Sequence, residues 1–171
     1  MTAKILLAVL VAISTLLVPE LAGAATTFAG PKFLDYPAAK TSIENISEPR
    51  LETAKDREYR SSILGAAHKG RVNFAGHYIF SVVGCGSSCS MAFILDAKDG
   101  SIYWLPFTVS YAEKADKGFG NEFYAFDFRT DSNLLVIQGS RNELNDDGLY
   151  DYVFGHGLLQ LVKSQPYPLK H

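Results

Sequence analysis

Features that usually identify a function are scarce in this sequence. Its 171 residues include only two cysteines, one tryptophan and four histidines, and a net charge of -2 shows little excess of either sign. Lysine and arginine are scattered rather than clustered, so the chain lacks the basic surface expected of a protein that binds nucleic acid. We therefore predict no nucleic acid among its partners.

Catalytic motifs are scarce as well. The sequence contains no G-x-S-x-G elbow and no pair of histidines at zinc-ligand spacing. The closely spaced glycines of "GFGNEF" at 118–123 follow no apolar strand, which argues against a phosphate-binding loop. These absences favour a protein without enzymatic activity and leave an enzyme as the alternative.

A long apolar run occurs only at the start of the chain. Lys4 precedes an apolar run over 5–18, and Ala22 and Ala24 occupy the small-residue positions of a signal-peptidase site. The run is shorter than the roughly 20 residues that span a bilayer core, and a proline follows it. We predict a signal peptide over residues 1–24 and a periplasmic or secreted product, with no membrane insertion after cleavage.

The remaining chain, residues 25–171, has the length of one globular domain with one apolar core. A hydrophobic content of 47% with 11 Phe and 9 Tyr favours a packed domain over disorder. Residues 25–49 are rich in Pro, Ala and Thr, which predicts an irregular arm. We expect Phe33, Leu34 and Tyr36 to hold this arm against the domain.

One helix is predicted, over residues 49–69. Apolar residues recur there at helical spacing, and Gly70 is placed to end the helix, with Pro49 tolerated in its first turn. The residues expected to face the core are Tyr59, Ile63, Ala66 and Ala67.

Residues 76–163 have the pattern of β-structure, because short runs rich in β-branched and aromatic residues alternate with turn residues. The turns "AKDG", "RTDSN" and "GHG" each predict a hairpin. The predicted strands cover residues 76–83, 90–96, 101–107, 122–128, 133–139, 149–154 and 158–163. We predict an α+β fold: a mostly antiparallel β meander of about seven strands, sandwich-like or barrel-like, with the helix packed on it.

The two cysteines close the segment "NFAGHYIFSVVGCGSSC" at 73–89. In an exported protein, Cys85 and Cys89 predict a disulfide, because the periplasm and the exterior are oxidising. Such a bridge closes a very small loop, so it shapes Gly86, Ser87 and Ser88 more than it stabilises the fold. The alternatives are a redox pair or nucleophilic cysteine, metal binding, and free thiols. A redox pair is disfavoured, because it would have two intervening residues and lie at a helix N-terminus.

His77 lies at the start of a predicted strand, on the same face as Ile79, Ser81 and Val83. A histidine among apolar neighbours is most often a structural hydrogen-bonding residue. Catalysis would require an orienting acid and a nucleophile beside it. The alternative is a small hydrolase-like enzyme that uses His77 with a carboxylate or an unbridged cysteine.

The stretch "NELNDDGLYD" at 142–151 partly matches a calcium-binding loop. Phe154 stands where such a loop has its last glutamate, and a hairpin turn explains the same composition. We predict no cofactor and no metal site, and keep a calcium-stabilised structural module as an alternative. The residues that match the loop are Glu143, Asn145, Asp147, Gly148 and Asp151.

The run "NFAGHY", followed by "GCGSSC" and by an apolar strand ending in "LDAKDG", resembles a family of small exported bacterial proteins of uncharacterised function. The resemblance covers about residues 59–107 and, more loosely, the last hairpin. Several members carry tryptophan where this chain has Val83. The resemblance implies export and a β-rich single domain, and it implies no reaction, ligand or catalytic residue.

Small size, export, an aromatic-rich sheet and one disulfide together favour a non-catalytic binding protein of the bacterial envelope. We expect an inhibitor or immunity-type partner of another envelope or secreted protein. The candidate binding residues are His77, Gly86, Ser87, Ser88, Arg141 and Glu143.

Overall fold

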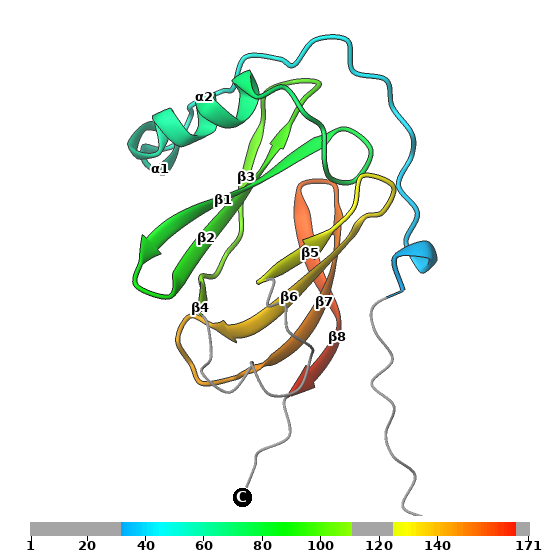
Figure 1. The fold of residues 1–171 in the computed structure, drawn as a ribbon. Helices are drawn as coiled ribbons and strands as arrows, with labels where there is room; N and C mark the ends of the chain where they lie inside the picture. Colours follow the sequence, from blue (N-terminus) through cyan, green and yellow to red (C-terminus); the bar gives the residue numbers. More distant parts are fainter. Residues whose placement is uncertain (1–31, 111–124, 167–171) are drawn as a thin grey trace, which may run out of the picture. The chain divides into compact units, whose positions relative to one another are not determined.

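The computed structural model describes residues 32–110 and 125–166 (Figure 1). Its helical elements and strands follow each other in the order that the sequence predicts, with the helices first. They are η1 (Phe33–Asp35), α1 (Ala54–Glu58), α2 (Arg60–His68), β1 (Tyr78–Gly86), β2 (Cys89–Asp96), β3 (Ile102–Trp104), β4 (Val109–Ser110), β5 (Phe126–Phe128), β6 (Leu134–Arg141), β7 (Gly148–Gly155) and β8 (Leu158–Pro166).

All strand pairs are antiparallel, and the strand order is β1-β2-β4-β6-β7-β8, with β3 paired to β2 and β5 paired to β6. The three hairpins predicted from their turns are therefore confirmed as β2–β3, β5–β6 and β7–β8. In the described part of the chain, β1 and β8 end the order, so the sheet is open and not a closed barrel. The prediction of a mostly antiparallel sheet with little helix is confirmed.

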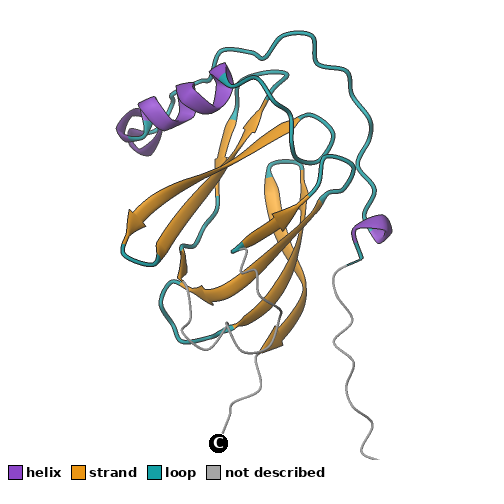
Figure 2. Ribbon diagram, in the orientation of Figure 1, coloured by secondary structure: helices purple, strands orange, loops and turns teal. Residues whose placement is uncertain are grey.

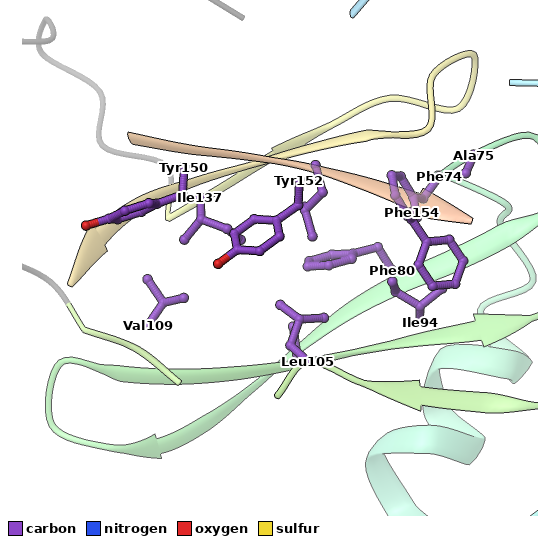
Figure 3. Close-up of a cluster of buried hydrophobic side chains, with 12 residues drawn as sticks. Phe74, Ala75, Phe80, Ile94, Leu105, Val109, Ile137, Tyr150, Tyr152 and Phe154 are labelled. Carbon is purple, nitrogen blue, oxygen red and sulfur yellow. The ribbon is translucent and has the colours of Figure 1, made fainter. Parts of the chain in front are cut away.

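The two halves of the sheet, β1–β4 and β5–β8, face each other across the main core (Figure 3). Phe80 and Ile94 point into it from one half, and Ile137 and Tyr152 from the other. Phe74, in the turn before β1, is fully buried, and its ring lies 5.8 to 6.2 Å from three other phenylalanine rings of this core. The core joins residues far apart in the sequence.

The helices cover the outer face of β1 and β2 (Figure 2). Ile63 and Ala66 of α2 pack there against Ile79, Phe93 and Leu95. Successive residues of a strand point to opposite faces, so Ile79 contacts the helix while Phe80 enters the main core. Both faces are buried at residues 79–80 of β1 and 92–95 of β2, which explains why the apolar residues there do not alternate with polar ones.

The N-terminal arm covers the outer face of the other half. Phe33 is buried against Leu134 and Val136 of β6, and Tyr36 packs beside them. The expectation that Phe33 and Tyr36 hold the arm is confirmed. The expectation for Leu34 is wrong, because its side chain is 86% exposed.

The predicted single helix over 49–69 is wrong at its start and in its continuity. Thr53 is the N-cap, and its side chain accepts from the Asp56 N–H while the Asp56 carboxylate accepts from the Thr53 N–H. This reciprocal capping starts the helix at Ala54. The helix is then interrupted at Tyr59, whose φ of -97° and ψ of 21° are not helical. The preceding chain instead hydrogen-bonds to the turn between β2 and β3.

The sequence-based prediction also omitted one strand and made another too long. The predicted strand over 101–107 is shorter, as β3, and residues 109–110 form β4, which was not predicted. The predicted strand over 122–128 is described only from residue 125, and β5 lies within it.

Strand β4 pairs on one side with β2 and on the other with β6. This close approach requires a glycine at position 139 of β6. Gly139 has a φ of +129°, and a Cβ there would lie 2.5 Å from the carbonyl oxygen of Ser110. Any other side chain would be strained by the backbone and would push β4 away.

We expect Gly139→Ala to lower the free energy of unfolding by about 2 kcal/mol or more, because it adds backbone strain to a steric clash. Gly155→Ala is the matched control, since Gly155 is also in a strand and a Cβ there meets nothing within 4 Å. Urea unfolding monitored by the fluorescence of Trp104 measures both variants. Equal stability of the two variants would contradict this account of β4.

Candidate functional site

The structure confirms the disulfide between Cys85 and Cys89, whose Cα atoms are 5.2 Å apart. The pairing of β1 with β2 shifts by one residue between Gly84 and Gly86, so Cys85 is the extra residue of a β-bulge. The bridge therefore joins the bulged residue to the first residue of β2. We call residues 84–89 the hairpin tip.

Bulge and bridge together fix an exposed turn. Gly86 has a φ of +138° and Ser88 a φ of +57°. Gly86, Ser87 and Ser88 are all exposed. Only Ser87 and Ser88 lie outside the two strands, so the turn is tighter than the sequence indicated.

A second loop lies at the same end of the sheet as the hairpin tip (Figure 1). Cys89 pairs with Ser110 of β4, and Ser110 pairs with Ser140 of β6. Residues 141–147 follow directly and connect β6 to β7. The two loops that the sequence proposed as contact regions are thus brought to one end of the sheet by β4.

The side chain of Arg141 holds the second loop in place. Its Nε and Nη2 donate to Oδ2 of Asp146 at 2.9 and 2.7 Å, and its Nη1 donates to the Tyr152 hydroxyl at 2.7 Å. The guanidinium carbon lies 3.7 Å from the centre of the Tyr150 ring. We call residues 141–147 the clamped loop. The guanidinium of Arg141 bonds to side chains of the same protein, whereas Glu143 is exposed.

Asp146 completes the clamp. Its Oδ1 accepts from the Arg141 backbone N–H at 2.7 Å and from the Ser140 hydroxyl at 3.2 Å. Burial by itself would raise the pKa of Asp146, but these hydrogen bonds and the Arg141 charge outweigh it and lower the pKa. The carboxylate is therefore ionised at neutral pH and stabilises the loop.

His77 lies at the other end of β1, about 23 Å along the chain from the start of the hairpin tip at 3.3 Å per residue. The prediction that it belongs to the strand is wrong, because His77 lies in the turn just before Tyr78. That turn is closed by backbone hydrogen bonds between Phe74 and Tyr78. The structure therefore does not bring His77 together with the other candidate residues.

The side chain of His77 is largely buried and contacts Asp96 and Tyr78. Its side chain is 16% exposed, its Nε2 lies 3.5 Å from Oδ2 of Asp96, and its ring stacks on Tyr78 at 4.0 Å between centroids. Burial lowers the pKa of His77 more than the Asp96 charge raises it, so the imidazole is neutral at pH 7. Burial, with the nearby Asp96 carboxylate, also raises the pKa of Tyr78 to about 12.

Asp96 supplies the acid that a catalytic histidine would need, but the thiol of the alternative hypothesis is not available. Both cysteines are in the disulfide. His77 also lines neither the hollow of about 530 Å³ beside the end of α2 nor the groove of about 490 Å³ between α2 and β1. The version of the enzyme hypothesis that uses an unbridged cysteine is therefore wrong.

The described residues contain no group of three or more His, Cys, Asp or Glu side chains that could hold a metal ion. Within the proposed calcium loop, Gly148 and Asp151 belong to β7, and Asp151 faces Lys163 of β8. Calcium binding stays an alternative that the fold does not test.

The groove between α2 and β1 was not predicted from the sequence. Its walls come from a helix face and a sheet edge, and which strand forms that edge depends on pairing between distant segments. A basic pair at the end of the helix, Lys69 and Arg71, was the only local signal for it.

Comparison of the chain with family models, with curated proteins and with solved structures found no match. The resemblance to small exported bacterial proteins stays a prediction. In the described ranges, no helix combines the length and the hydropathy that a membrane-spanning segment needs. The signal peptide predicted over residues 1–24 lies outside the described residues.

We expect the double variant Cys85→Ser/Cys89→Ser to fold and to lose roughly 2 kcal/mol of stability, because a bridge across so short a loop removes little entropy from the unfolded chain. Circular dichroism and urea unfolding measure this. Thiol titration of the unreduced, denatured wild-type protein should find no free thiol. Two free thiols would contradict the disulfide.

We expect Asp146→Asn to lower the free energy of unfolding by about 1 to 3 kcal/mol at pH 7, because it weakens charge-assisted hydrogen bonds of the clamp. The folded-state pKa of Asp146 is lowered, so its stabilisation is present above the ordinary aspartate pKa of about 3.9 and is lost as the pH falls further. The difference between wild type and variant should therefore shrink below about pH 4.

Asp147→Asn is the matched control for this pH dependence, and it should change stability by less than about 0.5 kcal/mol. Urea unfolding between pH 3 and pH 7 compares the three proteins. A constant difference between wild type and Asp146→Asn across this range would rule out the ionised clamp.

Proposed function

We propose that the protein is an exported envelope protein that binds another exported protein and catalyses no reaction. One observation carries the proposal: a disulfide closes the hairpin tip, the Arg141–Asp146 bonds close the clamped loop, and both loops lie at one end of the sheet. Exposed loops that are fixed before binding lose little conformational entropy when a partner docks. This arrangement suits an inhibitor or an immunity-type protein.

The chemistry of the two loops supports a protein partner. The hairpin tip offers hydroxyl groups at Ser87 and Ser88 and exposed backbone at Gly84 and Gly86. The clamped loop adds a carboxylate at Glu143 and an exposed Leu144. A mixture of hydrogen-bonding groups and a few apolar side chains is typical of protein interfaces.

Export is part of the proposal. A disulfide suits an oxidising compartment, and residues 1–24 have the composition of a cleaved signal peptide. The proposed location is the periplasm or the exterior. The contact between His77 and Asp96 supports a structural role for this histidine, since the carboxylate and the Tyr78 ring hold it in a turn.

Photo-cross-linking in the cell tests this function. The full chain carries a photoreactive amino acid in place of Ser87 or, as a matched control, in place of Leu158, which is 72% exposed at the start of β8. We expect a cross-linked protein adduct from position 87 on mature chains that begin at Ala25. We expect none from position 158.

The adduct should also be lost in the Cys85→Ser/Cys89→Ser background, because the tip is then no longer fixed. Mass spectrometry of the adduct identifies the partner as a protein. The absence of an adduct at position 87, or equal adducts at both positions, would contradict the proposal.

A further inference from the structure

The outer edge of β1 is not paired with another strand in the described residues. In an antiparallel pair, alternate residues direct their backbone groups toward the partner strand or away from it. The Phe80 N–H and C=O point away from β2, because both bond to the side chain of Asn73, at 2.7 and 3.0 Å. By the same alternation, Val82 and Gly84 also present their backbone groups to the outer edge.

The hydrogen bonds of β2 support the outward direction of the Val82 backbone groups. Ala92 is the residue of β2 that faces Val82, and its carbonyl accepts from the Leu105 N–H at 3.0 Å, on the side away from β1. Val82 and Ala92 are therefore a pair that does not exchange hydrogen bonds. The backbone donor and acceptor of Val82 are directed outward, at the edge of the sheet.

Asn73 closes this edge at one position only. Its side-chain amide bonds to Phe80 as a neighbouring strand would, with one donor and one acceptor. Beyond it, Val82 is 48% exposed, Gly84 is exposed, and a Cβ on Gly84 would meet nothing within 4 Å. The bulge at Cys85 ends the regular edge. We call Val82 to Gly84 the open edge.

A groove of about 490 Å³ lies between α2 and this edge. Its walls combine small polar residues of the helix with apolar residues of the strand. Among the described residues that line it, the charged ones are Lys69 and Arg71, which are both basic.

We propose that an extended, acidic segment of the partner protein adds to β1 as a further strand, with its backbone bonded to the open edge and its carboxylates beside Lys69 and Arg71. This inference rests on the proposed function and specifies the chemistry of the partner. The unpaired backbone requires an extended chain, and the groove's positive charge selects an acidic one. A second copy of this chain fits less well, because it would bring the same two cations to the interface.

The test uses the mature protein labelled with nitrogen-15 and two synthetic peptides. The first is acetyl-Glu-Val-Glu-Val-Glu-Val-amide, and the second has lysine in place of each glutamate. We expect the acidic peptide to shift the amide signals of Val82 and Gly84 and to slow their hydrogen exchange. We expect it to bind at least tenfold more tightly than the basic peptide at low salt.

Two kinds of variant sharpen this test. Lys69→Glu/Arg71→Glu should weaken the acidic peptide at least tenfold, whereas the matched control Lys32→Glu/Lys98→Glu, on exposed residues outside the groove, should not. Val82→Pro removes one edge N–H and should abolish the protection of Gly84. If this variant fails to fold, the charge-reversal pair decides the question.

Equal binding of both peptides, or shifts confined to other residues, would overturn the proposal. A dimer that forms with rising concentration and protects Val82 would overturn it in favour of a second copy. The outcome is separate from that of the proposed function. A cross-link at position 87 without peptide binding at β1 rejects only the edge site, and failure of both rejects the binding protein.

Discussion

The architecture depends on the double pairing of β4. Val109 and Ser110 bond to β2 on one side and to β6 on the other, so two residues join the halves of the sheet into one. This junction is possible because Gly139 has no Cβ at the point of closest approach. It also fixes the geometry of the candidate site, since the hairpin tip and the clamped loop extend from the strands that β4 connects. A loose β4 would free both loops at once.

The sequence predicted what depends on neighbouring residues and missed what depends on distant ones. The hairpins were predictable because their turns contain Gly, Asp and Asn at the required places. The start of the helix could have been predicted too, since Thr53 and Asp56 have the spacing of a capping box. The prediction instead followed the apolar spacing and placed the start at residue 49. β4 could not be predicted, because a two-residue strand is defined only by its partners.

The same distinction applies to the site. The disulfide followed from the cysteine count and from the predicted oxidising compartment, which both come from the sequence. The role of Arg141 did not, because its side chain reaches Asp146 and Tyr152 only in the register that β6 takes beside β7. The sequence indicated a contact residue at Arg141, and the structure adds that its side chain shapes the loop. His77 was misplaced by one residue, which moved it from a strand face into a turn.

The two edge strands differ in how they avoid pairing with other chains. β8 carries Lys163, ends at Pro166, and has an extra residue at Val162 where its pairing with β7 shifts. Charges, prolines and bulges are the usual protections of an edge. β1 has no charged residue and no proline, and Asn73 covers only Phe80. Val82 and Gly84 thus form an edge that is open over a short length and flanked by basic side chains. The cations beside this edge would repel a second copy of the chain and attract a single acidic strand.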